Sequence, residues 1–352
     1  MTNEMWTIKR CLDWTRDYLG NKGDERPRLS AEWLLSSVTG MSRTELYMSF
    51  DKPMDPLELD AMHAAVVRRA KGEPLQYIAG ETSFRMIDVA CEPGVLIPRP
   101  ETELLVEEVL AFLDREVLDS ASSRARAELP WNSEVQAARE AELEAAAKRE
   151  EADGGAAVEE ESEIGSEAVG PSEPEPERMA RVLEVGCGTG CISLSLAYER
   201  PERVTCVATD IEPRAVDLAI RNRDALGMDA DTIDIRLGNL VSPLDRETEW
   251  GTFDVLVSNP PYIPSDVMAT LPHEVVDYEP ALALDGGGDG LDIFRRLVKA
   301  APHMLRPGGL LACELYEGHL DAAAELCRAA GMCDVTVKCD LTNRPRMVLA
   351  RV

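Results

Sequence analysis

The feature that most constrains the fold is an alternation of short apolar runs with helical stretches, which begins at Arg181 and continues to the end of the chain. The apolar runs are residues 182–185, 204–208, 233–237, 255–258, 310–313 and 335–337, and the helical stretches include residues 214–226, 291–305 and 320–330. Apolar strands that alternate with helices are typical of a parallel sheet covered on both faces. We therefore predict a doubly wound, mostly parallel α/β sheet, with residues 347–352 as a last strand at its end.

The residues before this predicted sheet have a different pattern of apolar side chains. In residues 1–80 apolar side chains recur at helical spacing, and a helix is predicted over residues 56–71 because a proline stands in its first turn. We predict a small all-helical domain at 1–80, a connecting segment at 81–114 and the sheet domain at 179–352.

Residues 115–178 form an acidic segment that is rich in Ala and Glu and then in Gly, Ser, Pro and Glu. Residues 134–151 favour an exposed charged helix. Residues 153–177 have too few large apolar side chains to offset the entropy cost of ordering them. We predict a disordered, solvated insertion, with a partner-binding tail as the alternative.

The net charge limits the partners that the protein can bind. The chain has 65 acidic against 37 basic residues, a formal net charge of −28. Because phosphate backbones are bound by clustered Lys and Arg, this charge argues against bulk DNA or RNA as the partner. No apolar stretch approaches the ~20 residues that span a bilayer, and the first residues lack the features of a secretion signal. We expect a cytoplasmic protein without a membrane partner.

The nine cysteines and four histidines are scattered along the chain. None of the cysteines forms a C-x-x-C pair, which argues against a zinc site or a redox pair. We expect buried, reduced thiols and no bound metal.

A glycine loop follows the first apolar run of the sheet. Gly186, Gly188 and Gly190 form a G-x-G-x-G pattern, and Cys191 stands where a dinucleotide-binding loop would carry its third spaced glycine. Glycines are needed where a backbone turns tightly and approaches a ligand. Asp210, at the end of the second run, can accept both hydroxyls of a ribose, although a helix N-terminal charge is the alternative role. Together they predict a cofactor that carries adenosine, either S-adenosylmethionine or NAD.

The turn after the run 255–258 decides between these cofactors. It reads Asn259-Pro260-Pro261-Tyr262. An amide nitrogen is a poor nucleophile, and bonds from its NH₂ to the Asn259 side-chain oxygen and the Pro260 carbonyl would orient it and stabilise its developing positive charge. Tyr262 can stack on the planar group. The turn therefore predicts methylation of an amide-type nitrogen from S-adenosylmethionine, whereas a rigid proline turn with Asn259 as a cap is the structural alternative.

Longer stretches extend this interpretation to a family. Residues 72–80 (GEPLQYIAG), 96–103 (LIPRPETE), 279–287 (EPALALDGG) and 340–346 (DLTNRPR) carry the resemblance together with the turn at 259–262. The chain resembles the release factor glutamine N5-methyltransferases of the PrmC/HemK family over nearly its whole length, apart from the acidic insertion. The resemblance implies a class I S-adenosylmethionine methyltransferase fold, and a helical domain at 1–80 that docks the substrate. It also implies, as the acceptor, a glutamine in a Gly-Gly-Gln motif of a release factor.

The resemblance also implies roles for individual residues. The cofactor-binding set is Glu184, Gly186, Cys187, Gly188, Thr189, Gly190, Asp210, Asn239, Leu240 and Asn259. Asn259, Pro260, Pro261 and Tyr262 are the expected catalytic and substrate-binding turn. Arg99 and Glu101 are further substrate-binding candidates, with a structural salt bridge as the alternative. Relatives carry an Asp near the adenine where this chain has Asn239, whose amide can still hydrogen-bond the adenine edge.

Three rival functions stay open at this point. The first is methylation of an adenine or guanine amino group in nucleic acid, which the acidic charge disfavours. The second is an NAD oxidoreductase, which the missing third glycine disfavours. The third is a non-catalytic cofactor-binding or ribosome-associated module, which the complete turn at 259–262 disfavours.

Overall fold

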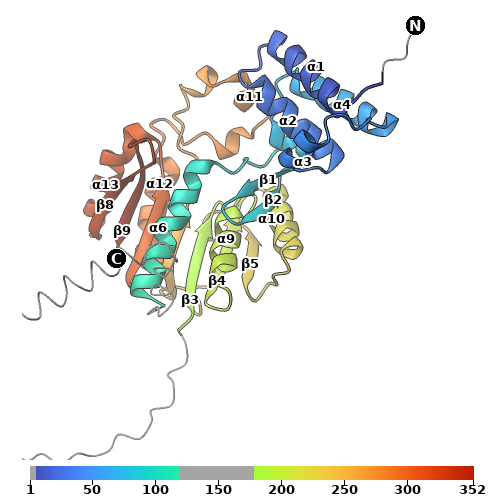
Figure 1. The fold of residues 1–352 in the computed structure, drawn as a ribbon. Coiled ribbons are helices and arrows are strands. Elements are labelled where there is room, and N and C mark those ends of the chain that lie inside the picture. Colours follow the sequence, from blue (N-terminus) through green and yellow to red (C-terminus); the bar gives the residue numbers. More distant parts are fainter. Residues whose placement is uncertain (1–4, 119–177) are drawn as a thin grey trace, which may run out of the picture. The chain divides into compact units, whose positions relative to one another are not determined.

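The computed structural model describes residues 5–118 and 178–352 (Figure 1). By compactness the chain divides into one unit of residues 1–110 and 180–352 and a second unit of residues 111–179. Nearly all of the predicted acidic insertion, including the predicted helix at 134–151, lies outside the described residues.

The described chain begins with a series of short helices, three of which start at a side-chain N-cap. They are α1 (Ile8–Asn21), α2 (Pro27–Thr39), α3 (Arg43–Met48), α4 (Pro56–Arg69) and α5 (Leu75–Ala79). Ser42 and Asp55 begin α3 and α4, each through a capping box with the glutamate three residues on. Leu19, Leu34 and Leu35 are completely buried between the helices. The predicted helical region is confirmed.

The segment predicted as a connection contains structure of its own. The strands β1 (Glu81–Phe84) and β2 (Ile87–Ala90) form an antiparallel hairpin, and α6 (Pro100–Glu116) follows. The helix therefore ends beyond residue 114, where the connecting segment was predicted to end.

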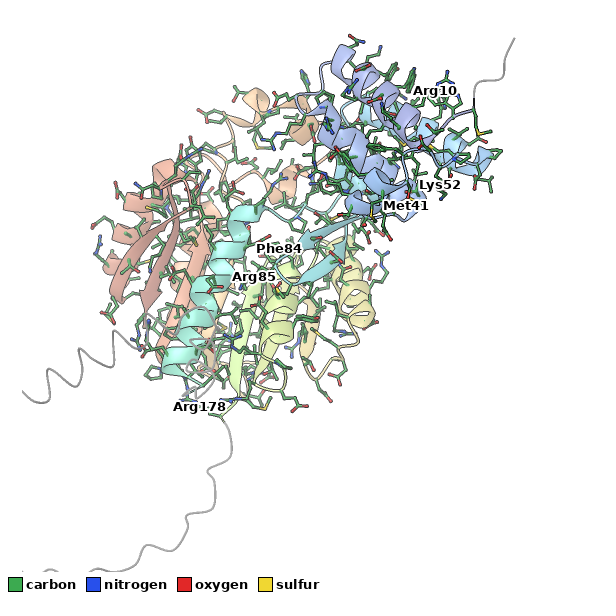
Figure 2. All side chains as sticks on the ribbon, in the orientation of Figure 1. Arg10, Met41, Lys52, Phe84, Arg85 and Arg178 are labelled. Atoms are coloured by element: carbon green, nitrogen blue, oxygen red, sulfur yellow. The ribbon has the colours of Figure 1, made fainter. Side chains whose placement is uncertain are left out.

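Arg85, in the turn of this hairpin, forms hydrogen bonds with both α6 and Glu199. Figure 2 labels it beside Phe84 at the end of β1. Its guanidinium donates to the carbonyl oxygen of Glu103 in α6 and to both carboxylate oxygens of Glu199. Arg85 has φ 50°, a conformation that few non-glycine residues adopt. The first turn of α6 is thereby held in place.

The rest of the unit is a seven-stranded sheet in the order β5-β4-β3-β6-β7-β9-β8. The strands are β3 (Ala180–Val185), β4 (Val204–Asp210), β5 (Ile233–Leu237), β6 (Phe253–Ser258), β7 (Leu305–Glu314), β8 (Cys333–Cys339) and β9 (Pro345–Arg351). The helices are α9 (Cys191–Glu199), α10 (Pro213–Ala225), α11 (His273–Val276), α12 (Asp292–Met304) and α13 (Leu320–Ala329), with short 3₁₀ turns η2 (Met268–Thr270), η3 (Ala281–Ala283) and η4 (Glu317–His319). Strands β3 to β7 pair in parallel. The predicted mostly parallel α/β sheet is confirmed.

One strand was placed wrongly by the sequence. The C-terminal strand β9 was expected at the end of the sheet, but it lies between β7 and β8 and is antiparallel to both. Its residues 347–350 are buried, whereas most of β8 is exposed. The apolar strand therefore takes the interior position, and the polar strand, with Asp334 and Lys338, forms the edge, where charged side chains discourage pairing with other chains.

Cysteine burial follows the same division. Seven of the cysteines are buried, and only Cys333 and Cys339, both on the edge strand β8, are exposed. The expectation of buried thiols is thus wrong for these two. No helix in the described ranges 5–118 and 178–352 is long and apolar enough to cross a membrane.

The order of the strands explains where a ligand can bind. From β3 the chain proceeds through β4 to β5 in one direction, whereas β6 and β7 lie on the other side of β3. Right-handed crossovers then place α9 and α10 on one face and α12 on the other. The direction reverses between β3 and β6, and ligands of such sheets bind beyond the carboxyl ends of the strands at this point.

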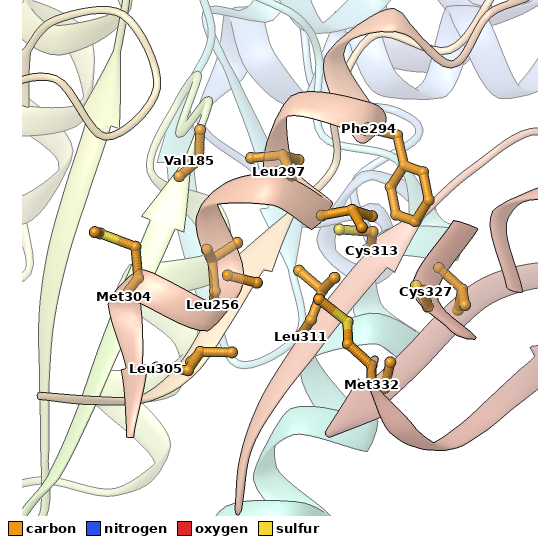
Figure 3. Packing of buried hydrophobic residues seen from close by; sticks show 14 of the residues in the cluster. Val185, Leu256, Phe294, Leu297, Met304, Leu305, Leu311, Cys313, Cys327 and Met332 are labelled. Atoms are coloured by element: carbon orange, nitrogen blue, oxygen red, sulfur yellow. The ribbon is translucent and has the colours of Figure 1, made fainter. Parts of the chain in front are cut away.

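The sheet and the helix α12 share an apolar core. Figure 3 shows Phe294 and Leu297 of α12 together with Leu256 of β6 and Leu311 of β7. All of these side chains have no exposed surface.

Truncation of Phe294 tests the importance of this core. We expect Phe294→Ala to lower the free energy of unfolding by about 3–5 kcal/mol, because a fully buried ring is lost and a cavity is left. Urea denaturation measures it. The control is Leu341→Ala at a side chain that is 92% exposed, which we expect to change stability by no more than about 0.5 kcal/mol. Equal losses in both variants would contradict the described packing.

Candidate active site

A cavity of about 310 Å³ opens beyond the carboxyl ends of β3, β4 and β6. Its walls come from segments that are far apart in the sequence. They are residues 94–99 with Thr102, 184–189 with Cys191 and Ile192, 209–212 with Ala215, 238–240, 258–261, 280 with 282–283, and Ile293 with Arg296. The cavity therefore lies at the position that the strand order predicts.

The glycine loop between β3 and α9 forms one wall. Gly186, Gly188 and Gly190 have φ of 75°, 55° and 81°, values that side chains disfavour. The carbonyl oxygen of Thr209 accepts from the backbone N–H of Gly186 and of Cys187, at 2.8 and 3.1 Å. The loop is thus fixed to β4 and turns its backbone toward the cavity.

Asp210 is the last residue of β4 and lines the cavity. Its Oδ2 accepts from the backbone N–H of Gly188 at 2.9 Å, and its Oδ1 accepts from the backbone N–H of Glu212 at 2.9 Å. Burial raises the pKa of this carboxyl, although the backbone donors lower it. Each oxygen keeps a lone pair, so the carboxylate can still accept from the hydroxyls of a ribose.

Glu184, on β3, is an unusual acid because it is 1% exposed. Its Oε2 accepts from the backbone N–H of Ser193 at 2.9 Å and from the Ser193 hydroxyl. Its Oε1 is buried and has no hydrogen-bond partner within residues 5–118 and 178–352. Burial raises the pKa of Glu184 to about 8, although the Ser193 donors lower it. A buried acceptor of this kind, on the cavity wall, is suited to a cationic group.

Asn259 follows β6 and lines the opposite wall. Its Nδ2 donates to the Thr102 hydroxyl oxygen at 3.0 Å, and that hydroxyl donates to Glu314 Oε2 at 2.7 Å. Thr102 and Glu314 are each 2% exposed. Burial raises the pKa of Glu314 to about 7, an effect that the Thr102 bond opposes. These buried hydrogen bonds hold the Asn259 side chain through its Nδ2 and leave its Oδ1 free to accept.

The backbone directly after the same turn is held by the glycine-rich loop at 284–291. Ile263 N–H donates to the Leu284 carbonyl, and Gly286 N–H donates to the Ile263 carbonyl, at 2.9 and 2.8 Å. A Cβ on Gly286 would lie 2.7 Å from Tyr262 Cα and 2.8 Å from the Pro261 oxygen. Only glycine fits at this position.

Asn239 and Leu240 line the cavity beyond the end of β5. The Asn239 Oδ1 accepts from Arg296 at 2.9 Å, which leaves the Nδ2 of this amide as a donor. Leu240 has φ 52° and a partly buried side chain that packs against the core.

Arg99 also lines the cavity, where it forms the structural salt bridge that was the alternative to a substrate contact. Its Nη2 donates to the two carboxylate oxygens of Glu279 at 2.6 and 2.7 Å, so a salt bridge is present. Burial raises the pKa of Glu279, and the charge of Arg99 opposes this.

Three expected site residues do not line the cavity, namely Gly190, Glu101 and Tyr262. A Cβ on Gly190 would lie 3.1 Å from Leu194 and 3.2 Å from Ala219, so this glycine lets α9 and α10 approach. Glu101 lies in the first turn of α6. Tyr262 packs against the core, and its burial raises the pKa of its hydroxyl.

Sequence reasoning missed other residues of the cavity and its supports. Ile211 and Leu282 line the cavity with side chains that are 49% and 56% exposed, and they offer apolar surface to a planar group. Thr102 lies inside the LIPRPETE stretch, which was noticed as a whole without this residue. Glu314 could have been found from its place, since it is a lone acid at the carboxyl end of an apolar strand.

Comparison with known proteins gives the class of this site. The model described as "Methyltransferase small domain" matches residues 159–339, and the one described as "PrmC N-terminal domain" matches residues 10–80. The sheet and its cavity thus form a methyltransferase domain, with the doubly wound fold of the class I type.

Relatives along the whole chain identify the family. Proteins named "Release factor glutamine methyltransferase" from Geobacter sulfurreducens and Chlorobaculum tepidum are 37% and 35% identical to this chain, over 349 and 346 residues. The alignments cover 99% and 97% of this chain and 98% and 96% of the relatives. The chain belongs to the release factor glutamine methyltransferase family.

Substitution of Gly286 tests the support of the 259–262 turn. We expect Gly286→Ala to lower the free energy of unfolding by about 1–3 kcal/mol, because the new Cβ meets backbone atoms that cannot move aside freely. Gly288→Ala is the matched control, since a Cβ there meets nothing within 4 Å. Chemical denaturation of both variants gives the comparison. A Gly286→Ala protein as stable as Gly288→Ala would show that the loop does not press on the turn.

Proposed function

We propose that the protein transfers a methyl group from S-adenosylmethionine to the side-chain amide nitrogen of a glutamine in a peptide chain release factor. The observation that carries the proposal is the state of Asn259, whose Nδ2 is engaged by Thr102 while its Oδ1 is left to accept. The free Oδ1 of Asn259 can accept a hydrogen bond from the NH₂ group of a substrate amide. The family to which the chain belongs supports glutamine as the bearer of that group.

The residues of the cavity fit S-adenosylmethionine. The buried Oε1 of Glu184 lacks a partner in the described part of the chain, and the ammonium of the cofactor's amino acid portion would supply one. Asp210 would hold the ribose hydroxyls, and Ile211, Asn239 and Leu240 would surround the adenine. When bound, the cofactor supplies a methyl group on a positively charged sulfur, which becomes a neutral thioether on transfer.

The turn at 259–262 would prepare the acceptor nitrogen. Oδ1 of Asn259 and the carbonyl oxygen of Pro260 would accept the two N–H groups of the glutamine amide and aim its nitrogen into the cavity. Both acceptors would also stabilise the positive charge that the nitrogen gains, which is worth several kcal/mol in a preorganised site. The resulting cation is strongly acidic and loses its proton to water without a dedicated base. We place the contact of Arg99 with substrate in the same proposal, whereas Tyr262, which packs against the core and does not line the cavity, supports the turn.

The release factor itself is proposed as a protein substrate that docks on the helical region at 1–80, with its Gly-Gly-Gln loop in the cavity. A cytoplasmic location goes with this substrate.

Substitution of Asn259 tests the proposed chemistry. We expect the wild-type protein to transfer labelled methyl groups to a purified release factor, and Asn259→Ala to lower kcat by about 10²–10³-fold through the loss of one oriented acceptor. Affinity for S-adenosylmethionine, measured by calorimetry, should stay within about threefold, since Asp210 and Glu184 remain. A variant with near-normal turnover would remove Asn259 from the mechanism. Transfer to nucleic acid by the wild-type protein in place of the release factor would refute the proposed substrate.

Proton release on cofactor binding tests the role of Glu184. Because burial raises the pKa of Glu184 to about 8, this group is mostly protonated in the free protein at pH 7. An adjacent ammonium lowers the pKa of Glu184, so cofactor binding should release up to about one proton at pH 7, where the amino group of the free cofactor is already mostly protonated. Calorimetry in buffers of different ionisation enthalpy counts the protons.

Two variants with equal net charge complete this test. Glu184→Gln should abolish the proton release, whereas Glu325→Gln, at a side chain that is 75% exposed, should leave it unchanged. Release that persists in Glu184→Gln would assign the proton to another group.

A further inference from the structure

The polar side chains behind Asn259 form a chain of hydrogen bonds that runs from Asn259 through Thr102 to Glu314. Thr102 Oγ1 lies 3.0 Å from Asn259 Nδ2 and 2.7 Å from Glu314 Oε2. The residues come from the turn after β6, from the first turn of α6 and from the last residue of β7. None of them is adjacent to another in the sequence.

The direction follows from counting protons. Thr102 has a single hydroxyl proton, and an ionised Glu314 can only accept, so in this charge state the proton points to Glu314. The hydroxyl oxygen of Thr102 can then only accept a hydrogen bond from Asn259. Asn259 must therefore turn the NH₂ group of its amide toward Thr102. The amide oxygen Oδ1 is therefore turned the other way. A flipped amide would place two acceptors against each other with no proton between them.

We propose that Thr102 and Glu314 are positioning residues, which set the orientation of the Asn259 amide so that its oxygen, and not its nitrogen, meets the substrate NH₂. The two side chains act through Asn259 and need not touch the substrate. They are buried enough, at 2% exposure each, to exclude water that would otherwise satisfy either orientation. Arg85 supports the arrangement from outside, because it holds the carbonyl of Glu103 next to Thr102.

The inference rests on the proposed function for its kinetic consequence, since only an NH₂-bearing acceptor distinguishes the two faces of the Asn259 amide. The hydrogen-bond directions themselves do not depend on the substrate. The experiment therefore needs one readout with the release factor and one without it.

The kinetic readout uses a pair of substitutions at Thr102. Thr102→Val keeps the shape and removes the hydroxyl, and we expect kcat with the release factor to fall by about tenfold or more while affinity for S-adenosylmethionine is unchanged. Thr102→Ser restores the hydroxyl and should recover most of kcat. A Thr102→Val enzyme with wild-type kcat, or a Thr102→Ser enzyme as slow as Thr102→Val, would overturn the proposal.

A double substitution tests the direction of the chain. Asn259→Asp places carboxylates on both sides of Thr102, which has one proton for two acceptors. Adding Glu314→Gln places an NH₂ donor beside the Thr102 hydroxyl oxygen. The Thr102 hydroxyl can then donate its proton to the carboxylate introduced at position 259. We expect kcat of the double variant to be about tenfold higher than that of Asn259→Asp alone. Glu314→Gln by itself should not raise kcat. Additive losses would contradict a directed chain.

The readout without substrate is nuclear magnetic resonance of the Asn259 side-chain NH₂ in the free, full-length protein, assigned by its loss in Asn259→Asp. One of its two protons should exchange slowly with water in the wild type and in Thr102→Ser, and rapidly in Thr102→Val. Identical exchange in the wild type and Thr102→Val would refute the hydrogen bond. If the wild-type protein does not methylate a release factor, the proposed function fails, and this readout still decides the orientation of Asn259.

Discussion

The hydrogen bond from Asn259 Nδ2 to the Thr102 hydroxyl, 3.0 Å long, joins the part of the chain before residue 110 to the sheet at the point where the chemistry is proposed to occur. The orientation of the Asn259 amide depends on it. Without the segment that carries Thr102, the cavity would lose the wall formed by residues 94–99, and the Asn259 amide would have no fixed orientation. The helix α6 is itself held by Arg85 from the hairpin β1–β2, so this small hairpin has a structural role in the site.

The two ends of the cavity illustrate two ways of fixing a binding group. Backbone N–H groups of the glycine loop donate to the backbone carbonyl of Thr209 and to the side-chain carboxylate of Asp210, both at the end of β4. The 259–262 turn is fixed on one side by the hydrogen bond between the Asn259 and Thr102 side chains and on the other by the close approach of Gly286. Both arrangements cost little reorganisation when a ligand binds, which is the condition for strong electrostatic stabilisation of a developing charge.

The sequence predicted what depends on neighbours along the chain. Strand and helix alternation, the glycine loop and Asp210 all follow from local spacing. What it missed depends on tertiary pairing: Thr102 is 157 residues from Asn259 and 212 residues from Glu314. The position of β9 inside the sheet was missed for the same reason, because the partners of a strand are chosen by burial and not by order. Tyr262 was expected in the cavity, and its ring packs against the core instead.

The position of the methyl group in the product shows whether the methylated atom is an amide nitrogen. Fragmentation mass spectrometry of a release factor incubated with the protein and S-adenosylmethionine locates the residue, and hydrolysis of the modified peptide identifies the bond. We predict one methyl group on a glutamine and release of methylamine on hydrolysis. Release of methanol, or a methyl group on another type of residue, would contradict it.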